Sequence, residues 1–308
     1  MSSTYPVSWR GYFAATATPF DRDLRLDESG FRTLLTWLIR EGMHGIAVAG
    51  TTGEWPSLER AERVRLFELA RETVPAHLPL IGGCSAISLA ETLKLVEACS
   101  SLELSGVLLT IPPYIHPTDD EVVYFYREVA RNSSLPIIVY NWPLGTGRDL
   151  GLGVLTRLAQ IDEVVALKNS TTSTRSFVEV LRALKDRLKI FGIMPGDTGL
   201  ELLQQVGGDG CIGAAGTLGK AQPGFFEAAW RGDVAEAAAL GRLDETLMRE
   251  LFDGFVGRHG HAIATCKALL RVRGLPAGPV RPPLLDLDDS GMAQVRTVAR
   301  RLGLVDVG

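Results

Sequence analysis

The stretch VVALKNS, from Val164 to Ser170, consists of four apolar residues followed directly by a lysine. A short apolar run bounded by polar residues predicts a strand that is buried on both faces. Seven similar runs recur along the chain, and they are GYFAATATPF (11–20), GIAVAG (45–50), PLIGGC (79–84), GVLLTIPP (106–113), PIIVYN (136–141), KIFGIMPG (189–196) and DGCIGAAG (209–216).

Segments with helical periodicity separate these runs, for example at residues 57–74, 88–99 and 118–130. Ser88 and Glu91 have the spacing of a capping box, and Thr118 precedes a first turn rich in acidic residues. Alternating helices and buried strands, with eight strands in all, predict a (β/α)8 TIM barrel. The alternative is a doubly wound open sheet, but the sequence TPFDRD after the first run lacks a glycine-rich nucleotide fingerprint.

The residues beyond the eighth strand predict further helices, joined by a proline-rich connector at 274–287. We therefore predict two parts. Residues 1–225 form the barrel with the active site, and residues 226–308 form a C-terminal helical extension.

Composition excludes several classes of function. The net charge is −4, and the 32 Lys and Arg residues are spread along the chain, so no basic patch predicts a nucleic-acid partner. The apolar runs are too short to cross a membrane, and MSSTYPVSWRGYF at the N-terminus does not resemble a secretory signal. The four cysteines form no CxxC pair, which favours free thiols in a reducing cytoplasm over disulfides or a zinc site; they are Cys84, Cys99, Cys211 and Cys266.

In a barrel of this kind, the chemistry takes place at the carboxyl ends of the strands. The residues predicted there are Thr51 and Thr52 after the second strand, Tyr114 after the fourth, Tyr140 on the fifth and Lys168 on the sixth. These side chains are therefore expected to converge on one mouth, where they could transfer protons around an amine.

Lys168 follows an apolar run, so its amine is expected to be desolvated. A desolvated amine loses its proton more easily and can attack a carbonyl carbon to form a Schiff base. Tyr140 could transfer protons if other hydroxyls relay them, and Thr51 and Tyr114 could provide that relay. Taken singly, Lys168 could instead extend outward from a strand end, and Tyr140 could be a core residue.

The turn GTTGE (50–54) combines two hydroxyls with several backbone N–H groups, which suits the binding of a carboxylate. Taken alone, this sequence could equally be a simple turn between a strand and a helix.

Four motifs together resemble those of the dihydrodipicolinate synthase/N-acetylneuraminate lyase family, whose members are class I Schiff-base lyases of the pyruvate type. They occur in the family's order and spacing across nearly the whole chain, and they are GTTGE (50–54), YNWPLGTG (140–147), ALKNS (166–170) and GLPAGPVRPPL (274–284). The resemblance implies that Lys168 forms the imine, that Tyr140 transfers the proton, and that Thr51 and Tyr114 are the relay.

The resemblance also implies how the substrate is held. Thr52 and Gly53, with the neighbouring turn amides, would bind the carboxylate of a 2-oxo acid, and the backbone carbonyl of Ile212 would line the pocket. The resemblance implies a cytoplasmic enzyme that is typically tetrameric and free of metal or organic cofactor, so a homotetramer or dimer without a cofactor is expected here.

The chain departs from the synthases of this family at two positions. Gly145 stands where a synthase has an arginine for the second substrate's carboxylate, and Arg148 lies three residues further on. Pro113 stands where a synthase has an aromatic residue at a subunit contact. Trp142 adds bulk beside the loop, which indicates a second substrate other than a simple dicarboxylate.

We therefore predict a class I aldolase that cleaves or forms a carbon–carbon bond of a 4-hydroxy-2-oxo acid, with pyruvate and an aldehyde as the partners. One alternative is a dehydratase of 2-keto-3-deoxy sugar acids that uses the same imine, and another is a divergent 4-hydroxy-tetrahydrodipicolinate synthase. A barrel that binds a small acid without catalysis is the alternative outside the enzymes, although such a protein has no need of a reactive amine.

Overall fold

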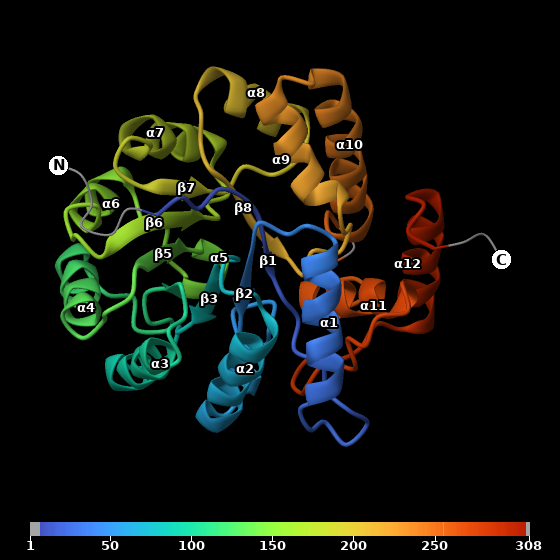
Figure 1. Cartoon of the computed structure of the whole chain (residues 1–308), viewed down its shortest axis with the longest axis horizontal. Coiled ribbons are helices and arrows are strands. Elements are labelled where there is room, and N and C mark those ends of the chain that lie inside the picture. The colour runs from blue at the N-terminus through green and yellow to red at the C-terminus, as the bar shows by residue number, and fades with distance from the viewer. Residues whose placement is uncertain (1–6, 255, 306–308) are drawn as a thin grey trace.

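The computed structural model describes residues 7–254 and 256–305. Within these residues eight parallel strands form one closed barrel in chain order, surrounded by helices (Figure 1). The predicted (β/α)8 fold is therefore confirmed. The strands are β1 Gly11–Ala15, β2 Gly45–Val48, β3 Leu80–Gly83, β4 Gly106–Leu109, β5 Ile137–Asn141, β6 Val164–Asn169, β7 Lys189–Phe191 and β8 Gly210–Ala214.

Several helices begin at residues whose side chains satisfy the free N–H groups of the first turn. The Ser88 hydroxyl accepts a hydrogen bond from the Glu91 amide at the start of α3, and Thr118 forms a complete capping box with Glu121 at the start of α4. The helices are α1 Glu28–Arg40, the 3₁₀ helix η1 Trp55–Ser57, α2 Arg60–Thr73, α3 Leu89–Ser101, α4 Asp119–Arg131, α5 Pro143–Thr146, α6 Leu152–Leu158, α7 Thr174–Leu184, α8 Asp197–Gln205, α9 Ala221–Arg231, α10 Val234–Leu251, α11 Ala262–Val272 and α12 Asp289–Arg301.

The interior of the barrel is filled by side chains. Phe13 of β1 and Phe191 of β7 pack with their ring centroids 5.1 Å apart, and Trp9 packs against the edge of Phe13. Tyr140 and Ile212 belong to the same apolar cluster. Because this core is packed, substrate can reach only the rim of the barrel, where the strands end.

The C-terminal helices build a second apolar core beside the barrel, and Figure 1 shows α11 and α12 outside the ring of α/β units. Leu251 of α10, Leu269 of α11 and Val295 of α12 are all buried in it. The predicted boundary between residues 225 and 226 falls inside α9, so one continuous helix joins the two parts. The division into two domains remains a prediction.

No helix in the described part of the chain is long and apolar enough to cross a membrane. All four cysteines are buried free thiols, and the Sγ atoms of Cys84 and Cys99 lie 3.6 Å apart. The N-terminal stretch MSSTYPVSWRGYF was predicted not to be a secretory signal, and its first six residues lie outside the described residues.

Asp244 on α10 is a buried carboxyl group, 2% exposed, whose one hydrogen bond within the described residues comes from Gln222 Nε2, 2.8 Å from Oδ1. Burial raises the pKa of Asp244 to about 6, although the hydrogen bond from Gln222 acts in the opposite direction. Between about pH 4 and pH 6 the folded protein therefore keeps a proton on Asp244 that the unfolded chain releases, so stability falls as the pH rises through this range and stays lowered above pH 6.

We expect Asp244→Asn to increase the free energy of unfolding at pH 8 by about 2 kcal/mol and to change it little at pH 4. Thermal and urea unfolding at the two pH values measure this difference. The exposed carboxylate Asp186 provides the control, since Asp186→Asn should show no such pH dependence. An Asp244→Asn protein that is less stable than the wild type at pH 8 would contradict the prediction.

Candidate active site

Lys168 and Tyr140 form the centre of the site. The β5–β6 register pairs these two residues directly, so their side chains leave adjacent strands at the same level. Lys168 Nζ lies 4.1 Å from the centroid of the Tyr140 ring, and the two residues are only 9% and 6% exposed. An amine and a phenol are thus held together in a largely dry position at the mouth of the barrel.

The Lys168 amine makes no hydrogen bond and no ion pair with any other described residue. Its known neighbour is the face of the Tyr140 ring, which attracts a cation only weakly compared with a carboxylate. Burying an amine without a polar partner lowers the stability of the fold. Such groups are found preferentially at functional sites.

A polar network holds the ends of β5 and β6 together beside this pair. Asn141 Nδ2 donates to Asn169 Oδ1 at 2.9 Å and to Asp149 Oδ1 at 2.7 Å. Thr171 Oγ1 donates to the other oxygen of Asp149 at 2.6 Å. Because Asn141 and Asn169 are the next residues after Tyr140 and Lys168, the network holds these two positions together.

The turn at residues 50–54 follows β2 at the same end of the barrel. It is closed by hydrogen bonds from Glu54 N to Thr51 O and from Trp55 N to Gly50 O. The N–H groups of Thr51, Thr52 and Gly53 donate no hydrogen bond to any other described residue. Such a row of free amides suits an anionic oxygen.

Gly53 is buried, and a Cβ at this position would lie 3.1 Å from Ala49 Cα, which is a tight contact. A side chain at this position would therefore disturb the packing beneath the turn.

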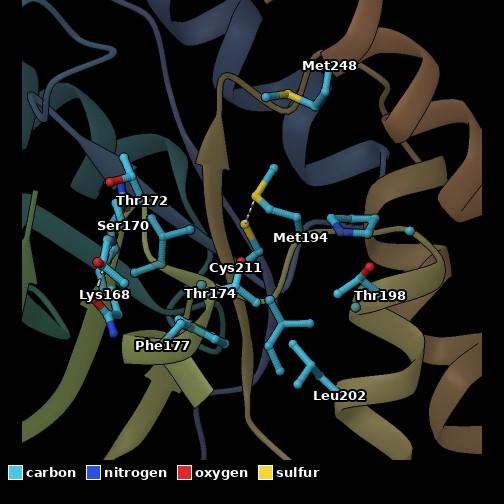
Figure 2. Close-up of a pocket in the computed structure, with 18 of the residues that line it drawn as sticks. Lys168, Ser170, Thr172, Thr174, Phe177, Met194, Thr198, Leu202, Cys211 and Met248 are labelled. Atoms are coloured by element: carbon cyan, nitrogen blue, oxygen red, sulfur yellow. Dashed lines mark hydrogen bonds between the residues drawn. The ribbon is translucent and has the colours of Figure 1, made fainter. Parts of the chain in front are cut away.

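A pocket of about 480 Å³ opens beside Lys168, between the loops after β6 and β7 and helix α10 (Figure 2). Lys168 is the single basic residue among the described residues that line it, and Glu245 and Asp253 are acidic. The rest of the lining combines hydroxyl and apolar side chains, which include Ser170, Thr171, Thr172, Thr174, Thr198, Phe177, Met194, Leu202 and Met248.

The loop after β5 carries no free cation. The Trp142 ring stacks on Tyr140, with a centroid separation of 5.8 Å and an angle of 14°. A Cβ on Gly145 would lie 2.0 Å from the Trp142 ring, so the indole occupies the space that a side chain at 145 would need. Arg148 does not replace the missing arginine, because its guanidinium donates to Asp119 Oδ1 at the start of α4.

The other predicted residues are placed differently. Ile212 on β8 is buried and lines the pocket with Lys168. The side chain of Tyr114 is 86% exposed and makes no hydrogen bond with any other described residue, so one chain alone does not bring it to Tyr140. Its role as a relay remains a prediction.

Sequence reasoning missed the hydroxyl-rich side of the pocket. The run NSTTST (169–174) follows the predicted sixth strand, and its unusual density of hydroxyls was the available signal. The described residues include no group of three or more His, Cys, Asp or Glu side chains able to hold a metal ion.

The sequence and the fold are similar to those of known proteins. The model of the dihydrodipicolinate synthetase family matches residues 8–302. A 4-hydroxy-tetrahydrodipicolinate synthase of Moorella thermoacetica is 32% identical over 97% of this chain and 100% of that protein. An uncharacterized DapA-like lyase of Rhizobium meliloti is 29% identical over 97% of this chain and 98% of that protein. The crystal structure of a dihydrodipicolinate synthase from Thermotoga maritima superposes with a TM-score of 0.88, at 26% identity, over 97% of this chain and 100% of that one.

Proposed function

The chain belongs to the dihydrodipicolinate synthetase family and is a pyruvate-dependent lyase, and from this premise we propose that Lys168 is its imine-forming residue. We further propose that the enzyme is an aldolase that cleaves or forms the C3–C4 bond of a 4-hydroxy-2-oxo acid. The single observation that supports the assignment best is the unpartnered Lys168 amine lying 4.1 Å from the centroid of the Tyr140 ring.

The proposed cleavage begins when the Lys168 amine attacks the C2 ketone and water leaves, which forms a protonated imine. Tyr140 then accepts the proton of the C4 hydroxyl, with Thr51 and Tyr114 as the proposed relay. The C3–C4 bond breaks, its electrons move to the imine nitrogen, and an aldehyde leaves. The remaining enamine is protonated at C3, and hydrolysis releases pyruvate and the free amine.

The carboxylate of the 2-oxo acid is proposed to bind at the turn of Thr51, Thr52 and Gly53. The free N–H groups of this turn, which follows β2 at the same end of the barrel as Lys168, support the assignment. Amide donors stabilise an anion by hydrogen bonds and place no second positive charge beside the protonated imine.

The aldehyde is proposed to be uncharged and hydroxylated. Gly145 and Trp142 leave no room for a cation after β5, and Arg148 is paired with Asp119. The pocket instead presents hydroxyl groups such as those of Ser170 and Thr172. An anionic aldehyde would lose its hydration in this pocket without gaining a positively charged partner.

Assembly into a homotetramer or dimer is part of the proposal. Four large apolar side chains after β3, β4 and β5 are more than half exposed, and they are Ile87 (59%), Tyr114 (86%), Ile115 (59%) and Leu144 (78%). Contact with a second copy over these residues would remove them from water and would enclose Tyr114.

The experiment has two parts. Borohydride reduction in the presence of pyruvate should leave a mass adduct on the peptide that carries Lys168. Pyruvate should then condense with glyceraldehyde, which is uncharged, with a kcat/KM at least about tenfold above that with succinic semialdehyde, which is anionic.

Met194→Arg places a cation in the pocket and should raise the rate with succinic semialdehyde relative to glyceraldehyde. Tyr124→Arg, on an exposed residue of α4 outside the pocket lining, is the matched control and should leave the ratio unchanged. The absence of an adduct on Lys168 would overturn the proposal, whereas loss of water from a 2-keto-3-deoxy sugar acid without release of aldehyde would identify the dehydratase.

A further inference from the structure

A buried ion pair joins the C-terminal extension to the turn at residues 50–54. Lys267 Nζ on α11 lies 2.7 Å from Oε1 of Glu54, the last residue of that turn. Both side chains are 0% exposed, so neither charge is solvated by water. Each charge therefore depends on the other, because an isolated buried charge is strongly destabilising.

Further hydrogen bonds connect the pair to its surroundings. Lys267 Nζ also donates to the backbone oxygens of Thr18, at 2.8 Å, and Pro279. The second carboxylate oxygen of Glu54 accepts from the backbone N–H of Arg281 at 2.9 Å. The turn is thus held from outside by α11 and by the connector that follows it.

A second anchor comes from β1's carboxyl end. Thr18 Oγ1 donates to Gly53 O at 2.7 Å, and Thr18 is 1% exposed. The carbonyl of Thr18 accepts from Lys267, so the two anchors meet in one residue.

The backbone of the turn needs these anchors. Glu54 has a φ of 58°, in the left-handed region that residues other than glycine seldom adopt. This conformation directs the chain after Glu54 so that Trp55 N donates to Gly50 O, which closes the turn. Strained backbone of this kind persists only where surrounding contacts hold it.

We propose that Lys267, Glu54 and Thr18 are positioning residues that shape the turn for the carboxylate of the 2-oxo acid. This inference rests on the proposed function of the turn. The Lys267–Glu54 ion pair has no net charge. It therefore acts on the geometry of the turn's N–H groups and does not change the net charge at the carboxyl end of the barrel. We therefore expect its loss to weaken binding of the 2-oxo acid while the chemistry at Lys168 continues.

The test compares Glu54→Gln and Thr18→Val. Each should raise the pyruvate concentration for half-maximal borohydride trapping, and the KM, by about tenfold, with kcat changed less than about threefold. Lys189→Met is the matched control, since the Lys189–Asp209 ion pair (2.9 Å) lies where β7 begins, at the opposite end of the barrel. It should leave KM unchanged.

Hydrogen–deuterium exchange of the peptide covering residues 49–58 provides a readout without substrate. Exchange should be faster in both turn variants and unchanged in Lys189→Met. If Glu54→Gln does not fold, Thr18→Val decides, because it exchanges a hydroxyl for a methyl group of similar size and leaves no charge unpaired. Wild-type exchange and wild-type KM in a folded Thr18→Val protein would overturn the inference.

Failure of the proposed function gives a different result. A wild-type protein that traps no pyruvate would show that the function is wrong, while exchange at residues 49–58 would still show whether Lys267, Glu54 and Thr18 hold the turn.

Discussion

Lys168→Met is expected to lower kcat by at least about 10⁴-fold and to abolish the borohydride-trapped adduct with pyruvate. Methionine has a similar length but no nucleophilic nitrogen, so no imine can form. The loss should appear in kcat, because the other contacts of the 2-oxo acid stay in place. Stopped assays for pyruvate release and mass spectrometry of the reduced protein measure the two effects.

The same substitution is expected to stabilise the fold. The Lys168 amine has no hydrogen bond or ion pair within the described residues, and the residue is only 9% exposed. Replacing it by an apolar side chain should therefore increase the free energy of unfolding by roughly 0.5–2 kcal/mol. An inactive protein with a raised melting temperature would show that the residue is retained for chemistry.

Lys185→Met is the control for both measurements. Lys185 is exposed, and its Nζ donates to Val206 O at 2.7 Å. This variant should keep its activity and its adduct. Release of pyruvate by Lys168→Met at more than about a hundredth of the wild-type rate would contradict an imine at this residue.

Tyr140→Phe is the second substitution with a large expected effect, a fall in kcat of about 10²- to 10⁴-fold. Phenylalanine preserves the aromatic ring, which stacks on Trp142 and whose centroid lies 4.1 Å from Lys168 Nζ. It removes the hydroxyl that would accept the proton of the substrate's C4 hydroxyl. Slow trapping of pyruvate on Lys168 should persist, since the amine is still present.

Tyr126→Phe is a matched control for Tyr140→Phe. Tyr126 is also buried, and its hydroxyl donates to Leu109 O at 2.7 Å. Losing this hydrogen bond should cost about 1 kcal/mol of stability and leave kcat within about twofold. A Tyr140→Phe enzyme with a kcat equal to that of Tyr126→Phe would show that Tyr140 does not transfer the proton.

Some features were readable because they depend on neighbours in the sequence. Each strand was predicted from a short apolar run, and all eight runs contain a strand in the structure. The start of α3 at Ser88 and that of α4 at Thr118 follow from side chains that bond amides three residues away. The predicted strand ends also indicated that Lys168 and Tyr140 lie together at the carboxyl end of the barrel.

Other features of the site depend on packing between distant residues. Gly145 predicted the absence of an arginine, but only the structure shows the Trp142 ring filling the space and Arg148 bound to Asp119. Tyr114 was expected at the mouth from its place after the fourth strand, and its 86% exposure depends on how the loop turns after that strand. No spacing rule predicts these orientations.

The sequence by itself therefore determined the barrel, the order of its strands and the residues at their carboxyl ends. The tertiary structure alone decided how the proposed reactive groups are held. Lys267 and Glu54 are 213 positions apart, yet their ion pair holds the turn with the free amides. The physical reason is that apolar periodicity is a local property, whereas a buried charge finds its partner only when the whole chain has closed around it.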